Sequence, residues 1–158
     1  MRPRFFQLLY DYMKNQSGIY LLVGDLGFGG ADKIRDELSE QFYNCGASEF
    51  SMMGIGVGLA MTGKVPFIYS IPTFLLYRPF EMIRNYVNHE KIPVKLVASG
   101  RDKEYTHDGF SHWAEDAKKT LDLFPNIIQY WPDTNEEMEK NVKEMINNDK
   151  PSFISLKR

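Results

Sequence analysis

Residues 46–70 read GASEFSMMGIGVGLAMTGKVPFIYS, and this stretch decides the fold class. Its first part, residues 48–61, predicts a helix with Ser48 as the N-cap and Glu49 in the first turn. Residues 65–70 form a short, continuous apolar run, which is typical of a strand buried inside a parallel sheet. A helix that leads directly into a fully buried strand indicates an α/β fold.

The rest of the chain repeats this alternation of short apolar runs with helical spacing. Further strands are predicted over residues 19–23, 42–45, 94–99, 127–130 and 153–156. Further helices are predicted over residues 4–14, 34–42, 74–88, 113–123 and 134–147. We therefore predict a doubly wound, mostly parallel six-stranded sheet with helices on both faces. No linker interrupts the pattern, so we expect residues 1–158 to form one domain.

The composition is that of an ordinary globular domain, with 43% hydrophobic and 25% charged residues and a net charge of -2. A slightly acidic chain argues against nucleic acids, which usually bind a basic face, so we expect no nucleic-acid partner. The single cysteine, Cys45, suits a reducing compartment, and residues 1–12 do not resemble a signal peptide. Lys64 and two prolines break the apolar stretch 55–76, so we expect no membrane span and a cytoplasmic location.

Glu49 is the first candidate site residue. A glutamate in the first turn of a helix is often there only because the helix dipole favours it. The same helix, however, contains glycines at positions 54, 56 and 58, and each costs about 1 kcal/mol relative to alanine. We expect close packing against another helix, of this chain or of a second subunit, to offset that cost.

Three aromatic residues form the second candidate set. Phe74, Tyr77 and Phe80 are spaced three apart, which puts them on one stripe of the predicted helix. Such a stripe fits either core packing or a stacking pocket for a planar ring. The sequence alone leaves both interpretations open.

Polar residues gather where predicted strands end, which is the edge at which parallel sheets bind ligands. Asp25 follows the first strand, in a glycine-rich loop that matches neither the dinucleotide fingerprint nor the P-loop. Residues 105–112, YTHDGFSH, follow a later strand and hold two of the three histidines beside Asp108. The ligands are too few for a metal site, and Ser111 lies in no nucleophile elbow. This loop fits a solvated surface or a hydrogen-bonding cover over a polar substrate.

Taken in this order, the residues resemble the pyrimidine-binding domain of transketolase-like thiamine diphosphate enzymes. The segments that carry the resemblance are 24–26, 45–49 with Met52, 58–60, 72–74, 83–84, 108–112, 125–127 and 132–133. It spans nearly the whole chain, and its specificity comes from the order and spacing of the segments together.

The resemblance implies a role for each candidate residue. Glu49 is similar to the glutamate that hydrogen-bonds N1′ of the cofactor pyrimidine and promotes proton removal from thiazolium C2. Phe74, Tyr77 and Phe80 are similar to the aromatic residues around the aminopyrimidine. Asp25 is similar to an aspartate near the thiazolium. Asp108 and His112 resemble the catalytic pair that binds the sugar donor, and Arg158 falls near a phosphate-binding arginine.

The departures from the family pattern imply a partner and an unusual substrate. The family's Gly-Asp-Gly…Asn metal motif is missing, so we expect a separate subunit to bind the diphosphate and Mg²⁺, in an α₂β₂ heterotetramer. Gly29 and Gly100 stand where transketolases use a serine and a histidine for the sugar phosphate. We therefore expect a transketolase subunit that moves a two-carbon ketol unit, with a modified or nucleotide-linked sugar as the hypothetical acceptor. The alternatives are a β-type subunit of a 2-oxo acid dehydrogenase E1 and a non-catalytic structural subunit.

Overall fold

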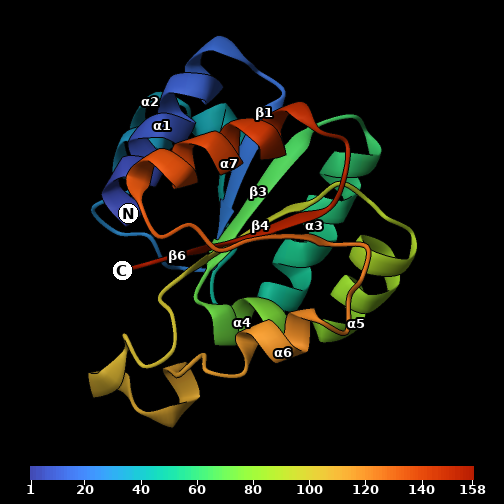
Figure 1. Ribbon diagram of the computed structural model, residues 1–158. Helices are drawn as coiled ribbons and strands as arrows, with labels where there is room; N and C mark the ends of the chain where they lie inside the picture. Colours follow the sequence, from blue (N-terminus) through green and yellow to red (C-terminus); the bar gives the residue numbers. More distant parts are fainter.

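The computed structural model describes residues 1–158, and its centre is an all-parallel sheet of six strands (Figure 1). The strands are β1 (Ile19–Val23), β2 (Phe42–Asn44), β3 (Val65–Ser70), β4 (Lys95–Ser99), β5 (Ile128–Tyr130) and β6 (Ser152–Leu156). Their order in the sheet is β2-β1-β3-β4-β6-β5, and every neighbouring pair is parallel. The predicted α/β fold class is confirmed, with a sheet that is wholly parallel.

Helices cover both faces of the sheet (Figure 1). One face carries α1 (Arg2–Asn15), α2 (Asp32–Glu37) and α7 (Asn135–Asn147). The other carries α3 (Glu49–Met61), α4 (Pro72–Tyr77), α5 (Phe80–Met82), α6 (Ala117–Leu121) and a π-helix, η2 (Ile83–His89). Three short 3₁₀ turns complete the chain: η1 (Ser39–Gln41), η3 (Thr106–Asp108) and η4 (Phe110–His112). None of the helices is long and apolar enough to cross a membrane.

The central strands are mostly apolar because each face packs against its own helices. In β3, Phe67 and Tyr69 join the cluster under α1 and α7, while Ile68 between them joins the cluster under α3 and α4. Strand β1 alternates in the same way, with Leu21 and Leu22 on opposite faces. This alternation explains why the sequence shows continuous apolar runs with no polar side.

The parallel arrangement brings the carboxyl ends of the strands to one edge. Strand β1 lies between β2 and β3, so the chain leaves β1 toward one side of the sheet and leaves β3 toward the other. The gap between β1 and β3 is therefore the topological switch point, where ligands bind in open α/β sheets. The segment that holds η3 and η4 extends from the body near α4 and α6 (Figure 1).

Three predicted helices are shorter or more divided than the sequence indicated. The helix expected over 74–88 is split into α4, α5 and the π-helix, because Pro79 has no N–H and ends the regular turn. The helix expected over 113–123 covers only Ala117–Leu121, because the Ala114 N–H donates to Asp102 O in an isolated bridge. The helix expected over 34–42 ends at Glu37, and Phe42 belongs to β2.

The glycines of α3 pack differently from the expected helix–helix contact. A Cβ at Gly56 would overlap Ile68 Cδ1, so this glycine lets α3 lie closely on β3. A Cβ at Gly54 would lie 3.7 Å from Met82 Cε, and one at Gly58 would face open space. Close packing thus accounts for Gly56, but against the sheet rather than another helix.

Candidate active site

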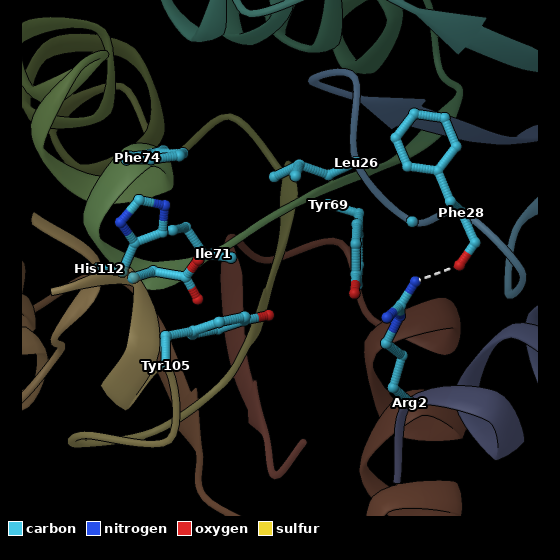
Figure 2. A pocket seen from close by; sticks show the side chains of 10 residues that line it. Arg2, Leu26, Phe28, Tyr69, Ile71, Phe74, Tyr105 and His112 are labelled. Atoms are coloured by element: carbon cyan, nitrogen blue, oxygen red, sulfur yellow. Dashed lines mark hydrogen bonds between the residues drawn. The ribbon is translucent and has the colours of Figure 1, made fainter.

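A pocket of about 290 Å³ opens at the switch point between β1 and β3 (Figure 2). Its walls come from the start of α1, from the loops after β1, β3 and β4, and from the end of β3. The lining residues are Arg2, Leu26, Gly27, Phe28, Tyr69, Ile71, Phe74, Tyr105, Asp108 and His112. Three predicted site residues, Phe74, Asp108 and His112, therefore share one pocket.

Phe74 and His112 lie against each other in this pocket (Figure 2). Their ring centroids are 5.0 Å apart in an edge-to-face arrangement, and the Tyr105 ring lies 6.2 Å from His112. Ser111 Oγ lies 3.0 Å from His112 Nδ1, whereas Nε2 has no hydrogen-bond partner in the chain. The imidazole is thus oriented by its neighbours with one nitrogen left for a ligand.

Glu49 is buried at the first turn of α3, with a side chain only 1% exposed. Its one side-chain hydrogen bond comes from Arg78 Nη1 and measures 2.7 Å to Glu49 Oε1. The carboxylate lies beside Gly24, where a Cβ would be in ordinary contact with Oε1 at 3.5 Å. A buried carboxylate held by a single protein group is costly, and such groups concentrate at functional sites.

Ser48 takes the predicted N-cap position of α3, although its side chain makes no cap hydrogen bond. Its hydroxyl pairs with Ser51 Oγ at 3.1 Å and does not reach a backbone N–H of the first turn.

Arg78, which contacts both Glu49 and Phe74, was not predicted from the sequence. It lies between α4 and α5, and its Cζ sits 3.6 Å from the centroid of the Phe74 ring. The guanidinium thus joins Glu49 to the aromatic wall of the pocket. The spacing of four from Phe74 could have indicated a shared helical face, although it carries no hint of Glu49.

The predicted aromatic stripe does not lie on one continuous helix, because Pro79 separates Phe80 from α4. The Tyr77 hydroxyl lies 3.1 Å from Thr120 Oγ1 on α6, and the Phe80 ring packs against Phe124 at 5.2 Å between centroids. Thr120 and Phe124 are four residues apart, so Tyr77 and Phe80 both contact the segment at and just after α6. Only Phe74 lines the pocket, and the roles of Tyr77 and Phe80 in cofactor binding stay predictions.

Asp25 and Arg158 lie outside the pocket lining. Asp25 has a left-handed backbone (φ 56°) that Asn44 supports, accepting from Asp25 N at 3.0 Å and donating to Asp25 Oδ1 at 3.2 Å. Arg158 donates from its main chain to Glu104 Oε2 at 2.9 Å, and its guanidinium lies 4.7 Å from the centroid of the Tyr105 ring. Arg158 therefore backs a pocket residue, and both site roles stay predictions.

Arg2 brings an unpredicted positive charge to the pocket. Figure 2 shows its guanidinium donating to the backbone oxygen of Phe28. Its Nε is buried and has no hydrogen-bond partner. Nothing in the local pattern of residues 1–12 distinguished this arginine from an ordinary helix-start residue.

Buried hydroxyl groups also lack partners at this edge. Ser70 Oγ, at the end of β3, and Thr73 Oγ1, in the first turn of α4, accept and donate no hydrogen bond within the chain. Together with the Glu49 carboxylate and the face of Phe74, these atoms suit a planar, nitrogen-containing ring. The residues present therefore fit the aminopyrimidine of thiamine diphosphate.

The sequence matches the family described as the transketolase pyrimidine binding domain over residues 1–158, and the chain belongs to this family. It is 32% identical over 160 residues to a putative transketolase C-terminal section from Methanocaldococcus jannaschii, covering 100% of this chain and 50% of that protein. It is 23% identical over 159 residues to the 6-deoxy-6-sulfo-D-fructose transketolase subunit SqwH from Clostridium sp., covering 100% and 49%. The chain thus spans about half the length of these curated relatives.

Solved structures agree with this assignment. A split gene transketolase, described as an inactive beta4 tetramer, superposes with a TM-score of 0.85 at 27% identity, covering 99% of this chain and 51% of that one. A transketolase from Campylobacter jejuni superposes with a TM-score of 0.88 at 22% identity, covering 99% and 25%, which shows the shared fold. Membership of this family implies dependence on thiamine diphosphate.

Proposed function

We propose that this chain is the pyrimidine-binding subunit of a split, thiamine diphosphate-dependent transketolase that transfers a two-carbon ketol unit between sugars. The observation that carries the proposal is the Glu49 carboxylate, which is buried beside Phe74 and held by one partly exposed arginine. Relatives named as transketolase subunits support the same interpretation. When bound, thiamine diphosphate supplies the electron sink for cleaving a carbon–carbon bond.

The chain's own residues bind and orient the cofactor ring and the sugar donor and hold the protons that move. Glu49 accepts a hydrogen bond from the pyrimidine edge and sets the proton position there, while Phe74 supports the ring face. Asp108 and His112 bind the hydroxyls and the carbonyl oxygen of the sugar donor. The free Nε2 of His112 holds or delivers a proton at that oxygen as negative charge develops. Arg2 adds a cation for an anionic end of the substrate.

A separate partner subunit would hold the diphosphate and Mg²⁺ in this proposal, as an α₂β₂ assembly in the cytoplasm. The support is the relatives named as subunits, among them an apulose-4-phosphate transketolase subunit of Phocaeicola vulgatus. The cofactor would then lie between the two kinds of subunit. Tyr77, at 39% exposure, is available for such an interface.

The acceptor would differ from an ordinary sugar phosphate. Gly29 and Gly100 have positive φ angles of 75° and 96°, which side chains rarely adopt. A Cβ at Gly100 would also overlap the Tyr105 ring, so the family's histidine could not be placed there without moving Tyr105. This geometry supports a modified or nucleotide-linked sugar as acceptor.

The test is reconstitution with the product of the neighbouring gene, followed by turnover with a ketose donor and a panel of phosphorylated, modified and nucleotide-linked acceptors. We expect ketol transfer that requires both subunits and fails with Glu49→Ala. Turnover with pyruvate as donor would favour the 2-oxo acid dehydrogenase alternative. Turnover that Glu49→Ala leaves unchanged would favour a structural subunit, and activity limited to ordinary pentose phosphates would contradict the altered acceptor.

A further inference from the structure

Arg78 occupies both surfaces that the proposed cofactor ring would use. One edge of its guanidinium donates to Glu49 Oε1 at 2.7 Å, and its Cζ lies 3.6 Å from the centroid of the Phe74 ring. No other side chain hydrogen-bonds to the Glu49 carboxylate. A ring that uses Glu49 Oε1 and the face of Phe74 that Arg78 covers cannot bind while Arg78 keeps this position.

The chemistry of the guanidinium explains why it fits there. It is planar and delocalised, with N–H donors along its edge and a flat face that stacks on aromatic rings. An aminopyrimidine has the same two features, a flat face and a polar edge. Arg78 therefore satisfies the site in the manner of the ring, whereas a lysine would supply only a point charge.

The two partners of this ion pair differ in their freedom to move. The Glu49 side chain is 1% exposed and fixed in the first turn of α3, but the Arg78 side chain is 43% exposed. Arg78 also lies where the chain passes from α4 to α5, beside the interruption at Pro79. If the pair separates, it is Arg78 that leaves, because water can solvate it immediately.

We propose that Arg78 is a place-holder for the cofactor pyrimidine. It keeps the Glu49 carboxylate paired and the Phe74 face covered while the site is empty, and it swings into solvent when thiamine diphosphate binds. This inference rests on the proposed function, because it takes Glu49 and Phe74 as the ring's contacts. It makes Arg78 an internal competitor that lowers the apparent affinity for the cofactor.

Calorimetry of thiamine diphosphate with Mg²⁺, titrated into the reconstituted two-subunit complex, tests the proposal without measuring turnover. We expect Arg78→Met to bind about 5- to 30-fold tighter than wild type, since one ion pair and one cation–π contact no longer compete. Arg35→Met is the matched control, because Arg35 is an exposed, ion-paired arginine on α2. We expect it to bind like wild type.

Arg78→Lys is a second variant that tests the proposal if Arg78→Met does not fold. It keeps the charge but not the planar stack, so we expect its affinity to fall between wild type and Arg78→Met. Equal or weaker binding by whichever Arg78 variant folds, with normal wild-type binding, would overturn the place-holder and leave the proposed function standing. Absence of binding by the wild-type complex would overturn the proposed function, and this inference with it.

Discussion

Two charged side chains, Glu49 and Lys95, are almost completely buried at opposite edges of the same sheet. Lys95, 1% exposed at the start of β4, donates to Asn148 O at 2.9 Å, Asn148 Oδ1 at 2.9 Å and Lys150 O at 2.6 Å. Glu49, 2% exposed at the opposite edge, has one partner, and that partner is partly exposed. The chain satisfies Lys95 internally and leaves Glu49 available to a ligand.

The largest expected difference between the two residues is in turnover. Glu49→Gln keeps the size of the side chain but removes its charge and its proton exchange. We expect kcat of the reconstituted enzyme to fall by about 10²- to 10⁴-fold, the usual contribution of an acid–base group. Steady-state kinetics checks this, with the exposed Glu40→Gln as control. A wild-type kcat in Glu49→Gln would contradict the idea that Glu49, unlike Lys95, is kept for a ligand.

The second prediction separates the substrate-binding part of the pocket from Glu49. His112→Asn removes the free imidazole nitrogen, so we expect kcat/KM for the ketose donor to fall by about 10²- to 10³-fold. Cofactor affinity should stay at the wild-type value. His107→Asn, in the same loop but outside the pocket lining, is the matched control. An equal loss in both variants would indicate damage to the loop rather than to a site.

The third prediction concerns folding stability. Lys95→Met removes three hydrogen bonds to oxygens between α7 and β6, two of which keep a second donor, and this should lower the free energy of unfolding by about 2–4 kcal/mol. Urea denaturation measures this, with the exposed Lys143→Met on α7 as control. We expect the folded fraction of Lys95→Met to bind cofactor normally. A wild-type free energy of unfolding in Lys95→Met would contradict the claim that the hydrogen bonds of Lys95 stabilise the fold.

The smallest effect is a dependence of stability on pH. Burial lowers the pKa of Lys95 to about 8, with Asp149 partly opposing the shift. Lysine in the unfolded chain stays protonated to about pH 10.4, so between pH 8 and 10 the unfolded state binds more protons. The free energy of unfolding of wild type, relative to Lys95→Met, should therefore rise with pH in that window by about 1 kcal/mol per unit. Denaturation curves at pH 8 and pH 9.5 check the sign, and a falling difference would contradict it.

The parts of the fold that the sequence predicted are those set by local pattern. The predicted bounds of β1 and β3 match the structure to the residue, because a continuous apolar run leaves little choice of where the strand begins and ends. The region after Thr73 was predicted less well, because Pro79 divides it and a π-helix follows. For the same reason Phe74, Tyr77 and Phe80 are divided between α4 and α5 instead of lying on one unbroken helix.

Candidate site residues could be proposed from the sequence only where the family pattern marks them. Glu49, Asp108 and His112 were identified by order and spacing, whereas the burial of Glu49 depends on how α3 packs against the end of β1. Arg78 and Arg2 carry no local signal, because each acts through contacts with segments distant in the sequence. The burial of Lys95 could not be predicted from the sequence either, since a lysine at the start of a strand usually lies in solvent.

The most direct test of the central claim, that Glu49 is kept for the cofactor, is calorimetric titration of thiamine diphosphate with Mg²⁺ into the reconstituted complex. Three complexes would be compared: wild type, Glu49→Gln and Lys95→Met. We expect Glu49→Gln to bind about 10- to 150-fold more weakly than wild type, the effect of losing a hydrogen bond to a charged group. Lys95→Met should bind like wild type. Equal affinity for wild type and Glu49→Gln would contradict the account.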